Sequence, residues 1–472
     1  MVLEGARGTR NQPMWRRALD VRRGPRRRLG WMVFGVALSC LALVTGDASV
    51  ASAVPQSQKA SAHVVWWFWG TSDVPGILKW LQGETKAYEE THKGVTITLV
   101  PQSTTTLIGA FQTAASTKSG PTIATQWATL PTLTPVWEGD VTPITTLVSK
   151  KMIDSWLNTD ENMYKKKLWA MPVYLLGTPF VWNKALFKRA GLNPTVGPKS
   201  WAQFLADCAK LKAAGITPIA SGEKTGALGA WLLGLVADQS LNSVKQIEEL
   251  ATGKYSLDSA AYKAGFQKID ELITKEYFNR NVASITLTQG WQEFAQGKGA
   301  FTWATDGEVL SMQKLMPAGA EGVEKTPVWG HGKLASYYDV TQSSDEFITS
   351  WASNKRDGAE FLSWLKEPKQ VASFYTSLGA FPASTSFNAA KEIKNPLAKQ
   401  LYALDTEKKQ VWTENFWPPQ VTTSGVRPGL EDMFAGASVT ATIKTIQQSF
   451  TTWRSEQPRQ LKDFTMWLKS QS

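Results

Sequence analysis

The stretch Leu168–Phe204 reads "LWAMPVYLLGTPFVWNKALFKRAGLNPTVGPKSWAQF" and carries the clearest fold signal in this 472-residue chain. Two short apolar strands are predicted, the first around Pro172–Tyr174 and the second ending in "WNK" at Trp182–Lys184. "SWAQ" at Ser200–Gln203 has the pattern of a capping box, so a helix should begin there and end at Gly215. This order of elements predicts an α/β protein.

The same rhythm is present nearer the N-terminus. A strand is predicted at His63–Trp69, a helix at Gly76–His92 and a β-branched strand at Val95–Val100. A helix over about 105–117 then leads to the strand "PTIATQW" at Pro121–Trp127. Strands that alternate with helices in this way predict a parallel sheet with helices on both faces.

Later segments extend the pattern. "ITPIA" (Ile216–Ala220) and "GAFTWAT" (Gly299–Thr305) are predicted strands, and the second should end in a turn that contains Asp306 and Glu308. "DGAEFLSWLKEP" predicts a helix with Asp357 and Glu360 in capping positions. No Pro/Gly/Ser-rich linker separates two autonomous domains, which suits two lobes between which the chain crosses more than once.

Residues 1–53 have the pattern of a signal peptide. Arginines precede the apolar run Leu29–Val44, and "ASA" at Ala51–Ala53 offers small residues for cleavage before Val54. The 16-residue apolar run is shorter than the roughly 20 residues of a membrane span, although an uncleaved anchor stays an alternative. Cys40 lacks the usual lipobox leucine three residues earlier. Residues 54–62 are expected to form a disordered tail.

Charge and cysteine content exclude several classes of protein. Without residues 1–53 the chain has 42 basic and 37 acidic residues, a mild excess that is spread along the sequence. This is no nucleic-acid footprint, so we expect no nucleic-acid partner. Cys208 is then the only cysteine, which excludes an intrachain disulfide, and its helical face predicts that it is a buried apolar residue.

Catalytic and metal-binding motifs are missing from the sequence. His63, His92 and His331 are far apart, and no nucleophile elbow, phosphate loop or dinucleotide fingerprint occurs. We therefore expect no metal, no cofactor and no catalytic residue. Asp306 and Glu308 are one conceivable glycosidase pair, but two carboxylates on one short loop fit a turn better than an acid/base pair.

Five segments in order resemble the sugar-binding group of extracellular solute-binding proteins of ABC importers, which includes maltose-binding protein. They are "VVWWFWG", "GPTIATQW", the stretch 168–204, "FAQGKGAFTWATDGEV" and "SLGAFPAST". Together they extend over nearly all of the chain after the signal peptide. Two departures are Thr122, where the family usually has Asp, and Trp303, which replaces a tryptophan that the family has after this strand.

The resemblance implies a two-lobed periplasmic-binding-protein fold. Each lobe would be a mainly parallel sheet flanked by helices, with a ligand held in the cleft between the lobes. Hinge crossings are expected at 174–178, 334–340 and 380–384. The remaining chain would divide into two lobes, which are 63–173 with 339–379 (lobe one) and 177–333 with 385–472 (lobe two).

Candidate ligand-binding residues follow from strand ends and from the resemblance. Alternation along the first strand places Trp66 and Phe68 on one face and Trp67 and Trp69 on the other, with Trp69 at the end nearest the cleft. Aromatic rings suit the C–H faces of a sugar, and polar side chains suit its hydroxyls. The full set of candidates is Trp69, Thr71, Ser72, Gln126, Trp127, Tyr174, Trp231, Trp303, Asp306, Trp351 and Trp417.

The expected function is that of an exported, monomeric substrate-binding subunit of an ABC importer. It would bind a carbohydrate, with an oligosaccharide favoured, and deliver it to membrane permease subunits without catalysis. It would act in the periplasm or on the outer face of the cytoplasmic membrane. Alternatives are the same scaffold with an amino acid, a polyamine or a phosphorylated polyol as ligand, and a secreted glycosidase.

Overall fold

The computed structural model of the chain describes residues 61–71, 73–104, 106–342 and 344–471. The predicted signal peptide, Cys40 and most of the predicted tail lie outside the described residues, whereas Ala62 already begins the first strand. In the described part of the chain, no helix is both long enough and apolar enough to cross a membrane.

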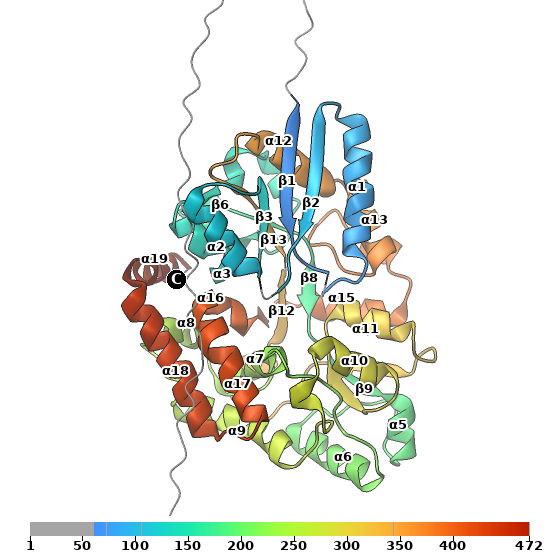
Figure 1. Cartoon of the computed structure of the whole chain (residues 1–472). Coiled ribbons are helices and arrows are strands. Elements are labelled where there is room, and N and C mark those ends of the chain that lie inside the picture. Colours follow the sequence, from blue (N-terminus) through green and yellow to red (C-terminus); the bar gives the residue numbers. More distant parts are fainter. Residues whose placement is uncertain (1–60, 72, 105, 343, 472) are drawn as a thin grey trace, which may run out of the picture. The chain divides into compact units, whose positions relative to one another are not determined.

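The first sheet is built around the aromatic strand near the N-terminus. Its strand order is β2-β1-β3-β13-β4, and β7 also pairs with β13. Figure 1 labels β1, β2, β3 and β13 of this sheet. β2 and β3 run parallel to β1, whereas β13 runs antiparallel to β3, β4 and β7. The strands are β1 (Ala62–Phe68), β2 (Val95–Pro101), β3 (Ile123–Gln126), β4 (Val141–Thr142), β7 (Met171–Pro172) and β13 (Asp345–Thr349).

Helices cover both faces of this sheet. Strand pairing places Trp66 on the same face as Ile123 and Ile348, and Phe361 of α12 packs edge-on against Trp66 at 6.0 Å between ring centroids. On the opposite face, Phe111 of α2 packs against Phe347 at 5.2 Å. The helices of this half are α1 (Ile77–Thr91), α2 (Leu107–Thr117), α3 (Leu130–Trp137), α4 (Lys150–Ile153), α12 (Lys355–Leu365) and α13 (Pro368–Leu378).

A second, smaller sheet has the order β10-β9-β11, and its named strands are antiparallel. Its parallel neighbours are isolated bridges only, such as Ile219 with Phe301. The named strands of this sheet therefore differ from the mainly parallel sheet that the family resemblance implies for this lobe. The strands are β9 (Phe180–Asn183), β10 (Phe301–Trp303) and β11 (Glu321–Glu324).

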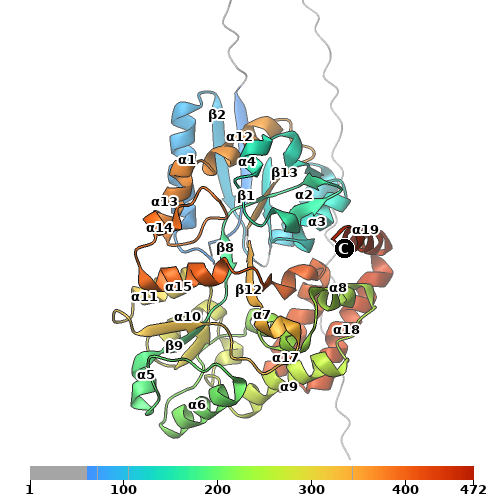
Figure 2. The same ribbon diagram turned by 180° about the vertical axis from the view of Figure 1, so that it is seen from behind.

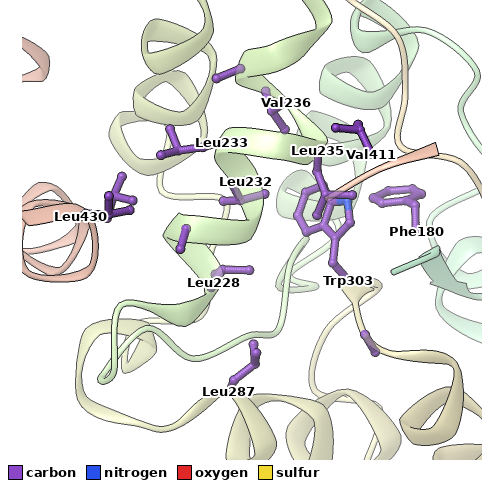
Figure 3. Packing of buried hydrophobic residues seen from close by; sticks show 14 of the residues in the cluster. Phe180, Leu228, Leu232, Leu233, Leu235, Val236, Leu287, Trp303, Val411 and Leu430 are labelled. Atoms are coloured by element: carbon purple, nitrogen blue, oxygen red, sulfur yellow. The ribbon is translucent and has the colours of Figure 1, made fainter. Parts of the chain in front are cut away.

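Helix α7 (Ala227–Leu235) lies at the centre of the apolar core of this half. Leu228, Leu232 and Leu233 are fully buried, and Figure 3 shows them beside Leu430 and Leu287. The helices of this half include α5 (Lys184–Arg189), α6 (Trp201–Ala213), α8 (Val244–Thr252), α9 (Ala260–Thr274), α10 (Leu287–Ala295), α11 (Asp306–Gln313), α14 (Ala389–Glu392), α15 (Pro396–Asp405), α16 (Pro419–Val421), α17 (Arg427–Phe434), α18 (Val439–Glu456) and α19 (Pro458–Gln471).

Three chain segments connect the halves and lie side by side. β8 (Leu175–Gly177) pairs antiparallel with β12 (Tyr338–Gln342), and Figure 2 labels both between the two halves. β12 also pairs in parallel with β14 (Gln410–Val411). The amide of Leu175 donates to the carbonyl of Phe381 at 2.8 Å, so the segments expected to cross between lobes form one hydrogen-bonded group. Their action as a hinge stays a prediction.

The last helix contacts both halves of the molecule. The indole of Trp467 in α19 donates to the carbonyl of Met163, at 3.2 Å, and the hydroxyl of Tyr164 donates to Asp463 at 3.3 Å. α19 also packs against α8 of the second half. The C-terminal residues therefore touch both proposed lobes.

The shortest remaining elements are β5 (Met163–Tyr164), β6 (Lys167–Leu168), η1 (Ile144–Thr146), η2 (Thr159–Asn162), η3 (Ala237–Ser240), η4 (Val282–Ser284), η5 (Lys333–Ser336), η6 (Thr413–Phe416) and η7 (Thr422–Val426).

Three local predictions need correction. The predicted strand at 216–220 is only an isolated bridge at Ile219, because its neighbours Phe278 and Phe301 each form a bridge with it at this one residue. Asp306 begins helix α11 instead of a turn, because the Thr305 hydroxyl accepts from the Glu308 amide and caps the helix. Asp357 lies inside the first turn of α12, since that helix already begins at Lys355.

Trp66 also forms a hydrogen bond to the buried carboxyl of Glu346, and a substitution can test how much this bond stabilises the first sheet. Its indole donates to Glu346 at 2.7 Å, and Thr125 and Ser344 donate to the same side chain. Burial raises the pKa of Glu346 to about 7, against the opposing effect of these hydrogen bonds. Trp66→Phe should lower the free energy of unfolding by about 2 kcal/mol, because a buried carboxyl loses a donor.

Urea denaturation at pH 7 measures this change. Trp80→Phe is the matched control, because the indole of Trp80 donates only to the neutral hydroxyl of Ser373. A loss for Trp66→Phe no larger than that for Trp80→Phe would contradict the role given to Glu346.

Candidate functional site

A small hollow lies where α7 meets the crossing strands. It is bounded by one face of α7, by the residue after β8, by β12 and by the start of η6. The lining residues are Thr178, Ala230, Trp231, Gly234, Leu235, Asp339, Trp412, Thr413 and Glu414. Helical periodicity explains this face, because residues 230, 231, 234 and 235 share one side of α7 while Leu228 and Leu232 point into the core (Figure 3).

Two half-buried tryptophans form one wall of the hollow. The rings of Trp231 and Trp412 meet edge to face, 5.6 Å apart at an interplanar angle of 71°. Trp231 also stacks on Trp291 at 6.1 Å, and the indole of Trp291 donates to the carbonyl of Trp303 at 2.8 Å. Trp291, which is held by this hydrogen bond, therefore packs against the Trp231 ring and limits its movement.

Polar groups line the rest of the hollow. The Thr178 hydroxyl is buried without a hydrogen-bond partner in the described structure. The Asp339 carboxyl lies over Gly234, where an added Cβ would come within 2.6 Å of its Oδ1 atom. Burial, with a smaller effect of nearby Asp238, raises the pKa of Asp339 well above its usual range. A hydroxyl and a carboxyl thus face the space beside the two rings, which is the pairing that a polyhydroxylated ligand needs.

Glu414, at the edge of the hollow, belongs to a chain of contacts that reaches the first sheet. Arg427 donates to its Oε1 atom from Nε at 3.0 Å and from Nη2 at 2.7 Å. The guanidinium carbon of Arg427 lies 5.5 Å from the centroid of the Trp127 ring. Trp127 in turn meets Trp69 edge to face at 5.6 Å.

Three of the residues proposed from the sequence belong to the hollow or to the chain of contacts that leads from Glu414 to the first sheet. Trp231 lines the hollow, and Trp127 and Trp69 continue the contacts of Arg427. Trp69 is only 5% exposed, and its indole donates to Thr104 at 3.1 Å. Thr71 is exposed after this strand, and Ser72 lies outside the described residues.

The other candidates are not among the residues that line the hollow. Gln126 is buried with a partnerless Oε1, and the hydroxyl of Tyr174 donates to Asp73 at 3.3 Å. Trp351 is half-buried beside Phe111. Trp303 and Trp417 are fully buried, the first against Phe180 (Figure 3) and the second against Phe450. The sequence reasoning did not single out Thr178, Asp339, Trp412, Glu414 or Arg427.

Two of these five residues, Thr178 and Asp339, could have been proposed from their position in the sequence. Thr178 and Asp339 fall inside or directly beside predicted crossings, and a polar residue there is a candidate for the cleft. Trp412 and Glu414 lie shortly before Trp417, but no local pattern separates the half-buried Trp412 from the fully buried Trp417.

Asp306 takes part in a buried pair of carboxyls at the first crossing. The Gly177 amide donates to its Oδ2 atom at 2.6 Å, and an added Cβ at Gly177 would lie 2.8 Å from the hydroxyl of Tyr338. Burial raises the pKa of Asp306 to about 7, against its hydrogen bonds to Asp405 and Gly177. Burial and the neighbouring Asp306 charge raise the pKa of Asp405 well above its usual range. One proton shared by the two carboxyls accounts for their proximity.

This pair predicts a dependence of stability on pH. The folded chain holds the Asp306 proton more tightly than an unfolded carboxyl with its usual pKa of 3.8. Its stabilising contribution is therefore complete below that value and is lost as pH rises through about 7. Asp306→Asn keeps an acceptor for Gly177 and a donor for Asp405, so Tm should fall less steeply between about pH 5 and 7 than in the wild type.

Differential scanning calorimetry over this pH range measures the slope. Glu276→Gln is the control, because Glu276 is exposed and its pKa is lowered by Lys212, so it stays ionised throughout. Equal slopes for Asp306→Asn and wild type would contradict the shared proton.

The protein belongs to the bacterial extracellular solute-binding protein family, whose family model matches residues 72–372. Among curated proteins, the sn-glycerol-3-phosphate-binding periplasmic protein UgpB of Pectobacterium atrosepticum is 25% identical over 58% of this chain. The match covers 64% of that relative, slightly less than two thirds of its length.

Solved structures share the fold at low identity. A chitin oligosaccharide binding protein has a TM-score of 0.75 at 18% identity, over 83% of this chain and 98% of its own. The GacH receptor of Streptomyces glaucescens, solved unliganded and with acarbose, has a TM-score of 0.68 at 16% identity, over 84% and 98%. These likenesses confirm the expected two-lobed α/β fold.

Proposed function

We propose that the protein is the exported substrate-binding subunit of an ABC importer and binds a neutral oligosaccharide in the hollow beside α7. The observation that carries this proposal is the edge-to-face pair Trp231 and Trp412 beside the partnerless hydroxyl of Thr178 and the carboxyl of Asp339. The rings can pack on the C–H faces of a sugar, while the polar groups bind its hydroxyls.

The charges around the hollow favour a neutral ligand over a phosphorylated one. Among the described residues that line it, none is a lysine, an arginine or a histidine, whereas Asp339 and Glu414 are acidic. The neighbouring cation, Arg427, already donates twice to Glu414. A phosphate would therefore find no unpaired cation among the described residues that line the hollow. The UgpB relatives, which are named for glycerol 3-phosphate, make this the second candidate ligand.

Binding without catalysis is part of the proposal. The conceivable acid/base pair was Asp306 and Glu308, and Asp306 is buried against Gly177 and Asp405 instead of lining the hollow. Delivery to membrane permease subunits, function as a monomer and export by the N-terminal segment belong to the same proposal. Membership of the solute-binding protein family supports the first, and the basic and apolar pattern of residues 1–53 supports the last.

Substitution of the ring that closes the hollow tests the ligand site. Trp412→Ala should weaken oligosaccharide binding at least about 10-fold, because it removes one wall of the hollow, and a tenfold change is about 1.4 kcal/mol. Isothermal titration calorimetry with malto-, xylo- and chito-oligosaccharides, and with glycerol 3-phosphate, gives the affinities. Trp351→Ala is the matched control, because Trp351 is also half-buried but packs beside Phe111.

Two outcomes would contradict the proposal. Equal affinities of wild type and Trp412→Ala would remove the hollow as the site, and binding of glycerol 3-phosphate alone would replace the ligand class. Release of shorter sugars from any of these oligosaccharides by the purified protein would show catalysis and support the glycosidase alternative.

A further inference from the structure

Two features of the backbone, a π-helical turn and a glycine, lie next to Arg427. It begins α17 directly after the π-helical turn Thr422–Val426, a rare distortion that is frequent at functional sites. Gly226, which caps α7 with a φ of 66°, lies against it, and an added Cβ there would come within 2.5 Å of the Arg427 Cβ atom. Glycine at 226 therefore lets the backbone of Arg427 approach the start of α7 closely.

The Arg427 side chain is oriented by Glu414, which belongs to the same half of the molecule. Both of its hydrogen bonds go to Glu414, and the two side chains are 17% and 8% exposed. A planar guanidinium that is held at one edge has a defined orientation, and its face is then available to an aromatic ring. That ring is Trp127, at 5.5 Å.

Trp127 belongs to the other half and is fixed there. It follows β3 in the first sheet, and its carbonyl accepts from the Thr132 hydroxyl at 2.8 Å. Its ring lies against Trp69, whose indole is bonded to Thr104. The Arg427–Trp127 contact therefore joins two prearranged groups from the two sides of the crossing strands. Both partners are protein groups, so the contact requires no ligand.

We propose that Arg427 is a latch that closes the two lobes by stacking on Trp127, and that it sets the fraction of closed molecules independently of the ligand. This proposal rests on the proposed function, because it concerns closure around the same hollow. The apparent dissociation constant of a ligand that binds the closed form is its intrinsic value divided by the closed fraction. Loss of the latch should thus weaken every ligand by the same factor, whereas loss of a direct ligand contact would affect different ligands differently.

Distance measurements on the ligand-free protein test the latch itself. In a Cys40→Ser background the remaining native cysteine, Cys208, is buried. Spin labels at Lys93→Cys and Lys188→Cys, two exposed positions on the two halves, can then report opening by double electron–electron resonance. Trp127→Leu keeps the Arg427–Glu414 pair intact and should shift the distance distribution toward the open form. Arg427→Gln should give the same shift, and Arg454→Gln, whose arginine donates to backbone carbonyls of α8, should give none.

Affinities complete the experiment. Arg427→Gln and Trp127→Leu should each weaken two oligosaccharides of different length by one common factor of about 3 to 10, and the double variant should be no weaker than either single variant. An unchanged distance distribution in Trp127→Leu would overturn the latch, and so would factors that differ between the two sugars. Absence of sugar binding by the wild type would defeat the proposed function instead, and the ligand-free distances would still report on the latch.

Discussion

The hydrogen bonding of the crossing strands is the constraint on which the rest of this structure depends. β8 pairs with β12, and the segment after β7 exchanges backbone hydrogen bonds with 381–383. The buried ammonium of Lys366 reinforces this group by donating to the carbonyls of Val173 and Ala383, at 3.1 and 3.2 Å. Each half has its own sheet, so the position of one half relative to the other is determined largely here. Burial lowers the pKa of Lys366 to about 7, while Asp345 and Glu346 act in the opposite direction.

The hollow is a consequence of this arrangement. Helix α7 presents a leucine face to the core of the second half, and its opposite face, with Trp231 and Gly234, meets the crossing strands at Thr178 and Asp339. The absence of a side chain at Gly234 makes room for the Asp339 carboxyl. A ligand in this place would touch α7, η6 and both crossing strands together, so its binding energy would bear directly on the position of the lobes.

Local pattern predicted much of the fold and less of the site. Alternation along β1 correctly separated Trp66 and Phe68, which pack together at 5.6 Å, from Trp67, and Ser200 caps its helix as expected. The hollow, by contrast, brings together residues 178, 231, 339 and 412, and no periodicity within one segment links positions so far apart. Trp303 and Trp412 show the difficulty, because burial of a ring depends on what packs over it, and that is a tertiary property.

A crystal structure of the protein without its N-terminal 53 residues, grown with the oligosaccharide that binds most tightly, tests the central claim most directly. The account predicts a sugar ring packed against Trp231 and Trp412, with hydroxyls bonded to Thr178 and Asp339. A ligand bound elsewhere with the hollow unoccupied would contradict it.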